Sequence, residues 1–154
     1  PLNNWNVSQV TDMSHMFSHA LRFNGNISGW NVSNVADMSN MFDWAWSFNA
    51  NISGWDVSSV INMNGMFYGA EDFNRNLAEW NVSSVTDMGD FLYLASAFSQ
   101  TNYDNLLVGW ASLPSLQIGV GLRVDQYFTE AVSNSSRSIL INTYNWTIID
   151  YGPN

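Results

Sequence analysis

The chain has 154 residues, a net charge of −9 and no cysteine, and 46% of its residues are hydrophobic. This length and apolar content allow one domain with a substantial core and exclude a disordered tail. Only four residues are Lys or Arg, too few for a phosphate-binding stripe, so we expect no nucleic-acid partner. No run of about 18 apolar residues exists, so we expect no membrane insertion in this portion.

Tryptophan recurs every 25 residues in the first two thirds of the chain, at Trp5, Trp30, Trp55 and Trp80. Counted from each tryptophan, Val recurs at +2 and +5, Met at +8, Met or Phe at +11, Phe or Leu at +12, Ala at +15, Phe at +18 and Ile or Leu at +22. A fixed period of this length is typical of solenoids, in which each unit buries its apolar face against its neighbours. We therefore expect four 25-residue repeats over residues 1–100.

The columns also predict structure within a unit. Positions +8, +11, +12 and +15 have the i, i+3, i+4, i+7 spacing of a short amphipathic helix, preceded by Asp or Asn at the N-cap position +7. Helices are expected over residues 13–20, 38–45, 63–70 and 88–95. The stretch ISGWNVSNV, residues 27–35, follows the spacing of a leucine-rich-repeat strand, with Trp30 and Val32 inward and Asn31 outward. We expect an α/β solenoid with a parallel sheet on one face and short helices on the other.

The 25-residue period fails after Phe98, and the next tryptophan, Trp110, lies 30 residues after Trp80. Residues 102–112 predict a helix, 116–122 a strand, 129–144 a partly helical segment and 146–151 a final strand. Because terminal repeats must cover an open end of the core, we expect residues 101–154 to form a C-terminal α/β cap, continuous with the repeats. The opposite end carries no comparable cap, so we expect a longer parent chain.

The unit W-[ND]-V-S-x-V-x-x-M-x-x-M-F-x-x-A-x-x-F-N-x-N-[IL] resembles the BspA-like surface-protein repeats, the DUF285 family. About a dozen offsets match in each unit over roughly residues 1–100. The resemblance implies a leucine-rich-repeat-like solenoid at an extracellular or cell-surface location, and it implies neither an enzyme nor catalytic residues. The stretches YDNLLVGWASLPSLQ and LINTYNWTI resemble the ending attached to such repeats in marine bacterial surface proteins.

Candidates for catalysis or metal binding are few. His15 and His19 have a spacing that can hold a metal on a helix, but no third ligand completes the set. Paired carboxylates occur only at positions 71–72 and 87/90, and the acidic residues at +7 fit helix caps better than a calcium ladder. We expect no catalytic residue, metal or cofactor.

Candidate binding residues are those that the core does not need. The first group projects from the expected sheet face at +1 and +3, where repeat proteins commonly bind partners: Asn6, Asn31, Asp56, Asn81, Ser8, Ser33, Ser58 and Ser83. The second group is Trp44 and Trp46, at +14 and +16, in columns that are not fixed as apolar. An exposed indole there would stack on a sugar or a partner protein, although packing between adjacent helices explains it equally well.

Asparagine also recurs at +19 and +21, where amides in register would hydrogen-bond along the stack. The chain also contains seven N-x-S/T sequons: Asn6, Asn26, Asn31, Asn51, Asn81, Asn134 and Asn145. In a secreted eukaryotic protein several of them would carry glycans, whereas in a bacterial protein they would be an accident of the consensus.

The leading hypothesis is a non-catalytic extracellular surface or matrix module that mediates protein or glycan interaction or assembly. The partner would be a protein or glycan at a cell surface, or copies of the chain itself. One alternative is a structural subunit of an extracellular filament or surface layer. A second is a carbohydrate-active enzyme, which needs carboxylates clustered in one cleft, and a third is an ice-binding face.

Overall fold

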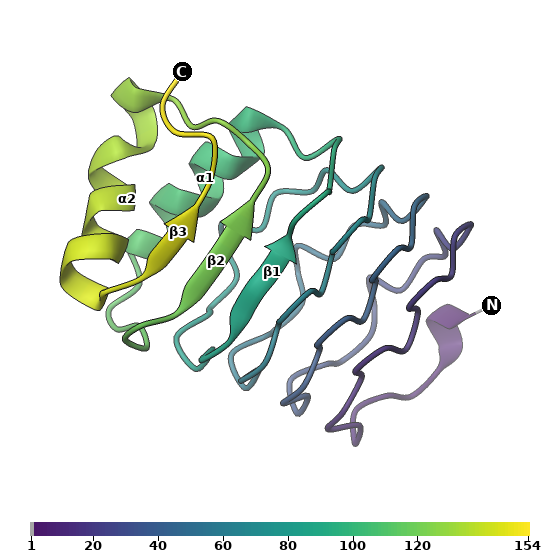
Figure 1. Cartoon of the computed structure of the whole chain (residues 1–154). Coiled ribbons are helices and arrows are strands. Elements are labelled where there is room, and N and C mark those ends of the chain that lie inside the picture. Colours follow the sequence, from purple (N-terminus) through teal and green to yellow (C-terminus); the bar gives the residue numbers. More distant parts are fainter. Residues whose placement is uncertain (1) are drawn as a thin grey trace.

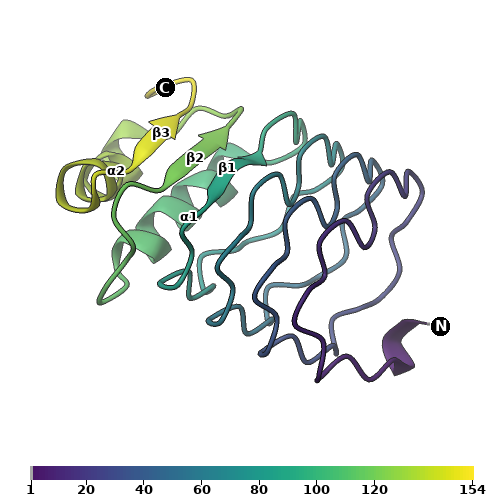
Figure 2. The same cartoon turned by 60° about the horizontal axis from the view of Figure 1, so that its bottom comes forward.

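The computed structural model describes residues 2–154 and stacks successive 25-residue turns of chain side by side (Figure 1). We call each turn a coil, and coils 1 to 4 begin at Trp5, Trp30, Trp55 and Trp80. The regular elements are a 3₁₀ helix η1 (Leu2–Asn4), β1 (Met88–Leu92), α1 (Gln100–Ala111), β2 (Gly121–Val124), α2 (Glu130–Tyr144) and β3 (Thr147–Ile149). The three strands form a parallel sheet in the order β1-β2-β3, with both helices at the C-terminal end of the stack (Figures 1 and 2).

The segments expected to be helices instead carry the hydrogen bonds that join one coil to the next. Residues 13–20, 38–45 and 63–70 are successions of turns, and residues 88–92 are strand β1, so the four predicted helices are wrong. From Met13, the N–H of every second residue donates to a carbonyl 24 residues later, beginning with Met13 to Asp37 at 2.9 Å. Isolated parallel bridges run through position +7 of all four coils, at Asp12, Asp37, Asn62 and Asp87.

Left-handed residues explain why a helical spacing folds without a helix. Position +14 has positive φ in all four coils, and position +10 has it in coils 1 to 3, where coil 3 uses Gly65 and Gly69. A residue in this conformation interrupts a right-handed helix. The chain therefore reverses locally at both positions, and the apolar residues at +8, +11, +12 and +15 still reach the core. In coil 2, Met38, Met41 and Phe42 are fully buried.

The segment expected to be a strand is a pair of turns. Within residues 27–35, the N–H of Trp30 donates to Ile27 O at 3.1 Å and that of Val35 to Val32 O at 2.9 Å. No strand is assigned there. The predicted side-chain directions are nevertheless correct, because Trp30 and Val32 are buried while Asn31 is exposed. The hydrogen bonds between coils therefore lie on the face where helices were expected. The paired turns of residues 27–35 and their equivalents in the other coils, here called the turn segment, lie on the face where the sheet was expected.

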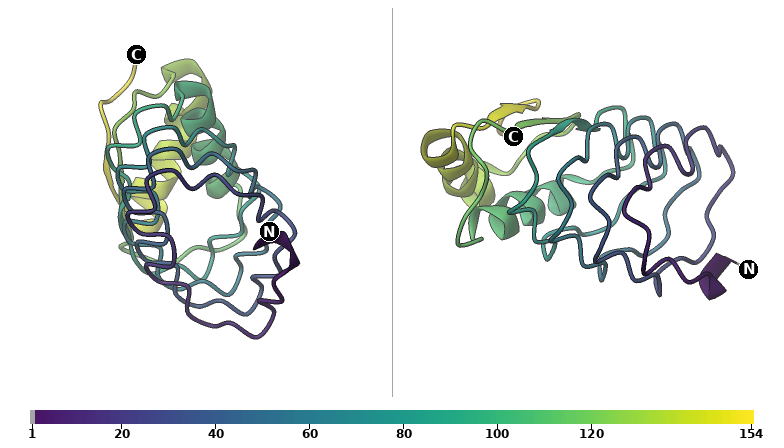
Figure 3. Two further views of the ribbon diagram at one scale, coloured as in Figure 1. Left: turned by 90° about the vertical axis from the view of Figure 1, so that its right-hand side faces the viewer. Right: turned by 90° about the horizontal axis from the view of Figure 1, so that it is seen from below.

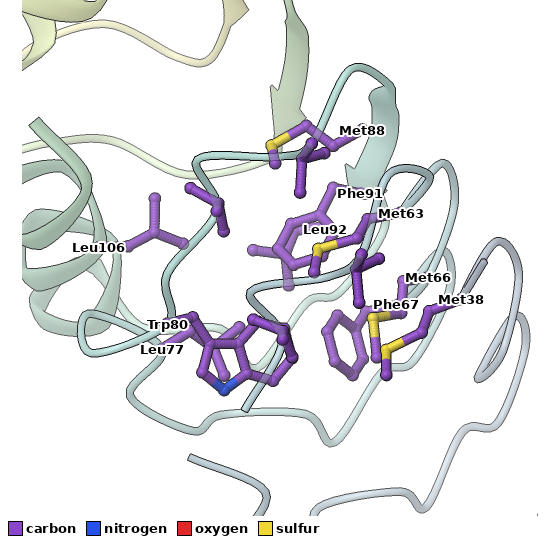
Figure 4. Close-up of a cluster of buried hydrophobic side chains, with 14 of the residues drawn as sticks. Met38, Met63, Met66, Phe67, Leu77, Trp80, Met88, Phe91, Leu92 and Leu106 are labelled. Carbon is purple, nitrogen blue, oxygen red and sulfur yellow. The ribbon is translucent and has the colours of Figure 1, made fainter. Parts of the chain in front are cut away.

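The interior of the stack is a continuous column of aromatic and methionine side chains (Figure 4). Phe42 stacks on Phe67 with ring centroids 5.7 Å apart, and Phe48 stacks on Phe73 at 5.9 Å. Viewed along the stack, the backbones of successive coils overlap as a series of offset loops (Figure 3, left). The +18 column makes the same stacked contact at every junction between coils, from Phe23 on Phe48 to Phe73 on Phe98. The +12 column stacks as far as Phe67 and ends at Leu92 in coil 4.

The C-terminal predictions agree with the structure in element type. Helix α1 confirms the helix expected over residues 102–112, and β3 confirms the final strand. Helix α2 is one continuous helix where only partial helix was expected over residues 129–144. Strand β2 overlaps the strand expected over residues 116–122 only at residues 121–122 and continues to Val124. Ser99 caps α1 by accepting the N–H of Asn102 at 3.2 Å.

Candidate functional site

The expected sheet-face residues lie in the turn segment and bond to one another. The side-chain oxygen of Asn31 accepts the N–H of Ser33 at 3.2 Å and its hydroxyl at 2.7 Å, and Asp56 accepts from Ser58 in the same way. Coils 1 and 4 repeat the amide contact, at Asn6 with Ser8 and at Asn81 with Ser83. The residues at +1 are exposed, but their oxygens are engaged in the turn that they stabilise.

Trp44 is the more unusual of the two tryptophan candidates. It has φ +51, in the left-handed region, which costs a bulky residue about 1–2 kcal/mol. Its indole lies against Gly69, the residue at the same position of coil 3, where an added Cβ would approach the ring to 2.8 Å. It also meets Tyr68 edge-on, with ring centroids 5.4 Å apart. A strained aromatic residue that the neighbouring coil accommodates with a glycine is a candidate for function.

A cavity of about 470 Å³ opens beside Trp44 where the coils meet the C-terminal elements. Its lining comprises Trp44, Glu71, Leu94, Ser96, Asp125 and Tyr151. Coils 2 to 4 contribute from positions +14 and +16 only, and the C-terminal region contributes Asp125 and Tyr151. The cavity therefore combines two aromatic side chains with two carboxylates and a hydroxyl, all from segments far apart in the sequence.

Hydrogen bonds fix the rim of this cavity. Asp125 accepts the N–H of Leu94, another left-handed residue, at 3.2 Å. The backbone N–H of Ala97 donates to Glu71 O at 2.9 Å, which ties coil 4 to coil 3 beneath the opening. Tyr151 is 57% exposed, so its ring is available at the edge of the cavity.

A second cavity of about 300 Å³ lies on the other side of Trp44, with Asp43 and Asp90 in its lining. Arg123 is close to it, with Nη1 3.6 Å from Asp90 Oδ1 and its guanidinium 3.3 Å from the centre of the Tyr93 ring. The face around Trp44 is thus acidic and aromatic, and it contains a cation at one edge.

Trp46 is 44% exposed and lies at the position that Glu71 and Ser96 occupy in the next two coils. It does not appear in the lining of either cavity. The structure therefore separates the two tryptophans, and Trp46 serves as a natural comparison for Trp44.

All seven sequon asparagines are exposed: Asn6, Asn26, Asn31, Asn51, Asn81, Asn134 and Asn145. The remaining column, at +19, forms a ladder. Asn24 Oδ1 accepts the N–H of Asn49 at 2.9 Å, and Asn49 Oδ1 accepts that of Asn74 at 3.1 Å. This confirms the expected bonding along the stack at +19. At +21 the expectation is wrong, because the side-chain oxygens accept the N–H two residues later in their own turn, as Asn51 accepts that of Ser53 at 3.2 Å.

His15 and His19 both lie in turns with positive φ, not on a helix. His19 Nδ1 lies 3.8 Å from Asp43 Oδ2, and both histidines are exposed. Within residues 2–154, no three His, Asp or Glu side chains gather closely enough to hold a metal ion. Among the same residues, no helix combines the length and apolar character needed to cross a bilayer.

The sequence indicated Trp44 but not the residues that the C-terminal region adds to the cavity. Positions +14 and +16 were visible as columns without a fixed apolar residue, and that variability marks Glu71, Leu94 and Ser96 as well. Asp125 and Tyr151 lie beyond the repeats, and no periodicity predicts where they fold. A combined site of this kind becomes visible only when the C-terminal elements are placed against coils 3 and 4.

These features define an α/β protein with a three-stranded parallel sheet, two helices and a large buried aromatic cluster, built on 25-residue units. The chain belongs to the family described as "Mycoplasma protein of unknown function, DUF285", which matches residues 1–105. Comparison with curated proteins and with solved structures gives no match.

Proposed function

We propose that the chain is a leucine-rich-repeat-like solenoid of four coils over residues 1–100, closed by a C-terminal α/β cap over residues 101–154. The inter-coil hydrogen bonds and the aromatic column support the solenoid. Support for the cap comes from α1 and α2, which lie beyond coil 4 in Figure 1 and bury Leu106, Leu107 and Leu140.

We further propose that this solenoid is a non-catalytic module of a cell surface or extracellular matrix that binds a protein or a glycan. The observation that carries the proposal is the cavity beside Trp44. Two aromatic rings offer flat faces for a sugar ring or a partner side chain, and Glu71 and Asp125 offer acceptors for hydroxyl or ammonium groups. The left-handed backbone at +14 is common to all four coils, so what distinguishes coil 2 is the large indole that Trp44 carries there.

The test replaces each tryptophan by the residue that another coil carries at the same position. Trp44→Gly introduces the residue of coil 3 and removes the left-handed strain, while Trp46→Ser introduces the residue of coil 4. Both variants should fold. Binding of the unmodified chain is measured by tryptophan fluorescence and calorimetry against an oligosaccharide panel and immobilised cell-surface and matrix glycoproteins.

We expect Trp44→Gly to weaken binding at least tenfold and Trp46→Ser to change it less than twofold. An equal loss of affinity in both variants would show that the ligand does not bind at the cavity. No binding by the unmodified chain to any of these preparations, with the chain remaining monomeric, would contradict the interaction module itself.

An extracellular location is part of this proposal, and the exposed sequons give a way to test it in a eukaryotic secretory pathway. Intact mass spectrometry of secreted protein would show glycan mass increments that Asn→Gln substitutions remove one at a time. A fully unmodified secreted chain would leave the exposed +1 side chains free of glycans and would contradict the expectation that the sequons are glycosylated in such a pathway.

The carbohydrate-active alternative draws support from one observation, the presence of Glu71 and Asp125 in one cavity. Incubation of the protein with labelled oligosaccharides tests it directly. Product formation that Glu71→Gln abolishes, with binding retained, would favour the enzyme. Binding without turnover would favour the non-catalytic module.

A further inference from the structure

The side of coil 1 that faces away from coil 2, here called the N-terminal face, leaves apolar groups exposed that every other coil buries. Trp5 is 55% exposed, whereas Trp30, Trp55 and Trp80 are 1–4% exposed. Met16 is 38% exposed, whereas Met41 is fully buried. The difference is confined to one side, because the opposite side of Trp5 stacks on Trp30 with the rings 7° from parallel.

The backbone of the same face has a definite polarity. At the junctions between coils, carbonyl oxygens accept from the preceding coil: in coil 2 these are Asp37, Ser39, Met41 and Asp43. The equivalent oxygens of coil 1 belong to Asp12, Ser14, Met16 and Ser18, and no residue among 2–154 donates to them. The face therefore presents a row of four acceptors together with the exposed ring of Trp5.

The indole of Trp5 adds a donor in a defined place. In coils 2 to 4 the indole N–H donates to the carbonyl 28 residues earlier, three residues before the tryptophan of the preceding coil: Trp30 to Leu2 at 2.9 Å, Trp55 to Ile27 at 3.2 Å and Trp80 to Ile52 at 3.2 Å. A partner that satisfies Trp5 must place a carbonyl oxygen at the corresponding point.

One partner meets these requirements together. A coil of the same class presents on its C-terminal side four outward N–H groups, a carbonyl three residues before its tryptophan and the rings of its Trp and Phe columns. We propose that the N-terminal face is the docking surface for one further 25-residue coil of this class, bound in parallel register. This inference is independent of the ligand proposed for the cavity.

The same polarity disfavours a symmetric dimer through this face. Two copies that meet face to face would set acceptor rows against each other, and buried carbonyls without donors are costly. Head-to-tail contact between copies is disfavoured as well, because the C-terminal side of coil 4 pairs with β2 and not with solvent. The surface is therefore specific for the side of a coil that carries N–H donors.

The test extends the full chain by a copy of residues 26–50 fused directly ahead of position 1, with Pro1 replaced by Asn, the residue at +21 in coils 1 to 3. The junction then repeats an internal one. Hydrogen exchange of the Trp5 indole N–H, assigned by Trp5→Phe, is measured by NMR. Exchange of the Trp80 indole reports whether each protein is folded.

We expect exchange at Trp5 to slow at least tenfold in the extended chain and the urea midpoint to rise. Trp5→Phe should lower the midpoint of the extended chain and leave that of the original chain unchanged. A composition-matched extension of shuffled sequence should give no protection.

Three results would overturn the proposal: unchanged exchange at Trp5 in the extended chain, equal protection from the shuffled extension, or concentration-dependent protection of Trp5 in the original chain. The last result would identify a second copy as the occupant of the face.

Discussion

The indole N–H of Trp110 donates to the carbonyl oxygen of Leu77 at 3.1 Å, the same contact that Trp55 makes with Ile27 and Trp80 with Ile52. Trp110 breaks the 25-residue spacing in sequence but continues the tryptophan ladder in space. Trp146 extends the series, with its indole bonded to Gln117 O at 2.8 Å. Five extra residues between Trp80 and Trp110 are absorbed by the chain that leads into and through α1, and the core contact is kept.

The first prediction concerns this contact. Trp110→Phe keeps an aromatic ring but leaves the carbonyl of Leu77 without its donor inside the core, so we expect a loss of about 2–4 kcal/mol in the free energy of unfolding. Trp5→Phe is the matched control, because Trp5 is half exposed, and it should cost no more than about 0.5 kcal/mol. Urea unfolding followed by circular dichroism measures the free energy of unfolding of both variants. Equal losses in the two would show that the indole–carbonyl hydrogen bonds of the tryptophan ladder do not stabilise the protein.

A second prediction concerns the approach of α1 to coil 4. Gly109 packs so closely on the carbonyl group of Ala78 that an added Cβ would collide with its oxygen. Gly109→Ala should therefore displace α1 and destabilise the protein by about 1–3 kcal/mol, despite the better helix propensity of alanine. Gly54→Ala is the control, because nothing lies within 4 Å of its added Cβ. A Gly109→Ala variant as stable as Gly54→Ala would mean that α1 docks elsewhere.

The sequence predicted the core well and the backbone of each unit poorly. Met38, Met41, Phe42 and Ala45 are buried as their spacing requires, yet the same spacing arises from two left-handed reversals as readily as from a helix. Periodicity records which side chains point inward and not how the chain connects them. The glycines at positions 65 and 69 were the available signal, because they occupy the left-handed positions of coil 3.

The cavity shows a different limit of sequence reasoning. Trp44 stood out because its column is not fixed as apolar, whereas Asp125 and Tyr151 follow the last repeat and have no column. Their positions depend on how β2 and the chain after β3 pack against coil 4, a tertiary arrangement that no local pattern encodes. The carboxylate of Asp125 reaches the site because Leu94 N–H bonds to it.

A third prediction concerns the buried ion pair of the C-terminal region. Arg137 donates to Asp150 through Nε at 2.8 Å and Nη2 at 3.0 Å, and Tyr103 OH donates to the same carboxylate at 2.6 Å. Burial, and then the charge of Asp150, raise the pKa of the Tyr103 phenol. The Asp150 side chain is 2% exposed, so Arg137→Met leaves a buried charge without its ion-pair partner.

We expect Arg137→Met to cost about 3–5 kcal/mol and to loosen α2 from α1. Asp90→Asn, which removes the other carboxylate–arginine contact at an exposed position, should cost at most about 1 kcal/mol. Thermal unfolding and hydrogen exchange in α2 provide the measurements. An Arg137→Met protein with unchanged protection in α2 would show that apolar packing alone holds the helices together.

The last prediction concerns the pH dependence of one turn. Hydrogen bonds from the hydroxyl and then the amide of Ser58 lower the pKa of Asp56 below its ordinary value of 3.8. A carboxylate whose pKa is lower in the folded state contributes stability that is fully present above the unfolded pKa and is lost as the pH falls through the folded pKa. Asp56→Asn copies coils 1, 2 and 4 and has no such dependence. The difference between the urea midpoints of the two proteins should therefore shift in favour of Asp56→Asn as the pH falls from 7 to 2.5, with most of the change below pH 4. Adding Ser58→Ala to both proteins removes the hydroxyl contact and should make this shift smaller. A difference in urea midpoint that stays constant from pH 7 to pH 2.5 would show that the turn does not favour the charged side chain.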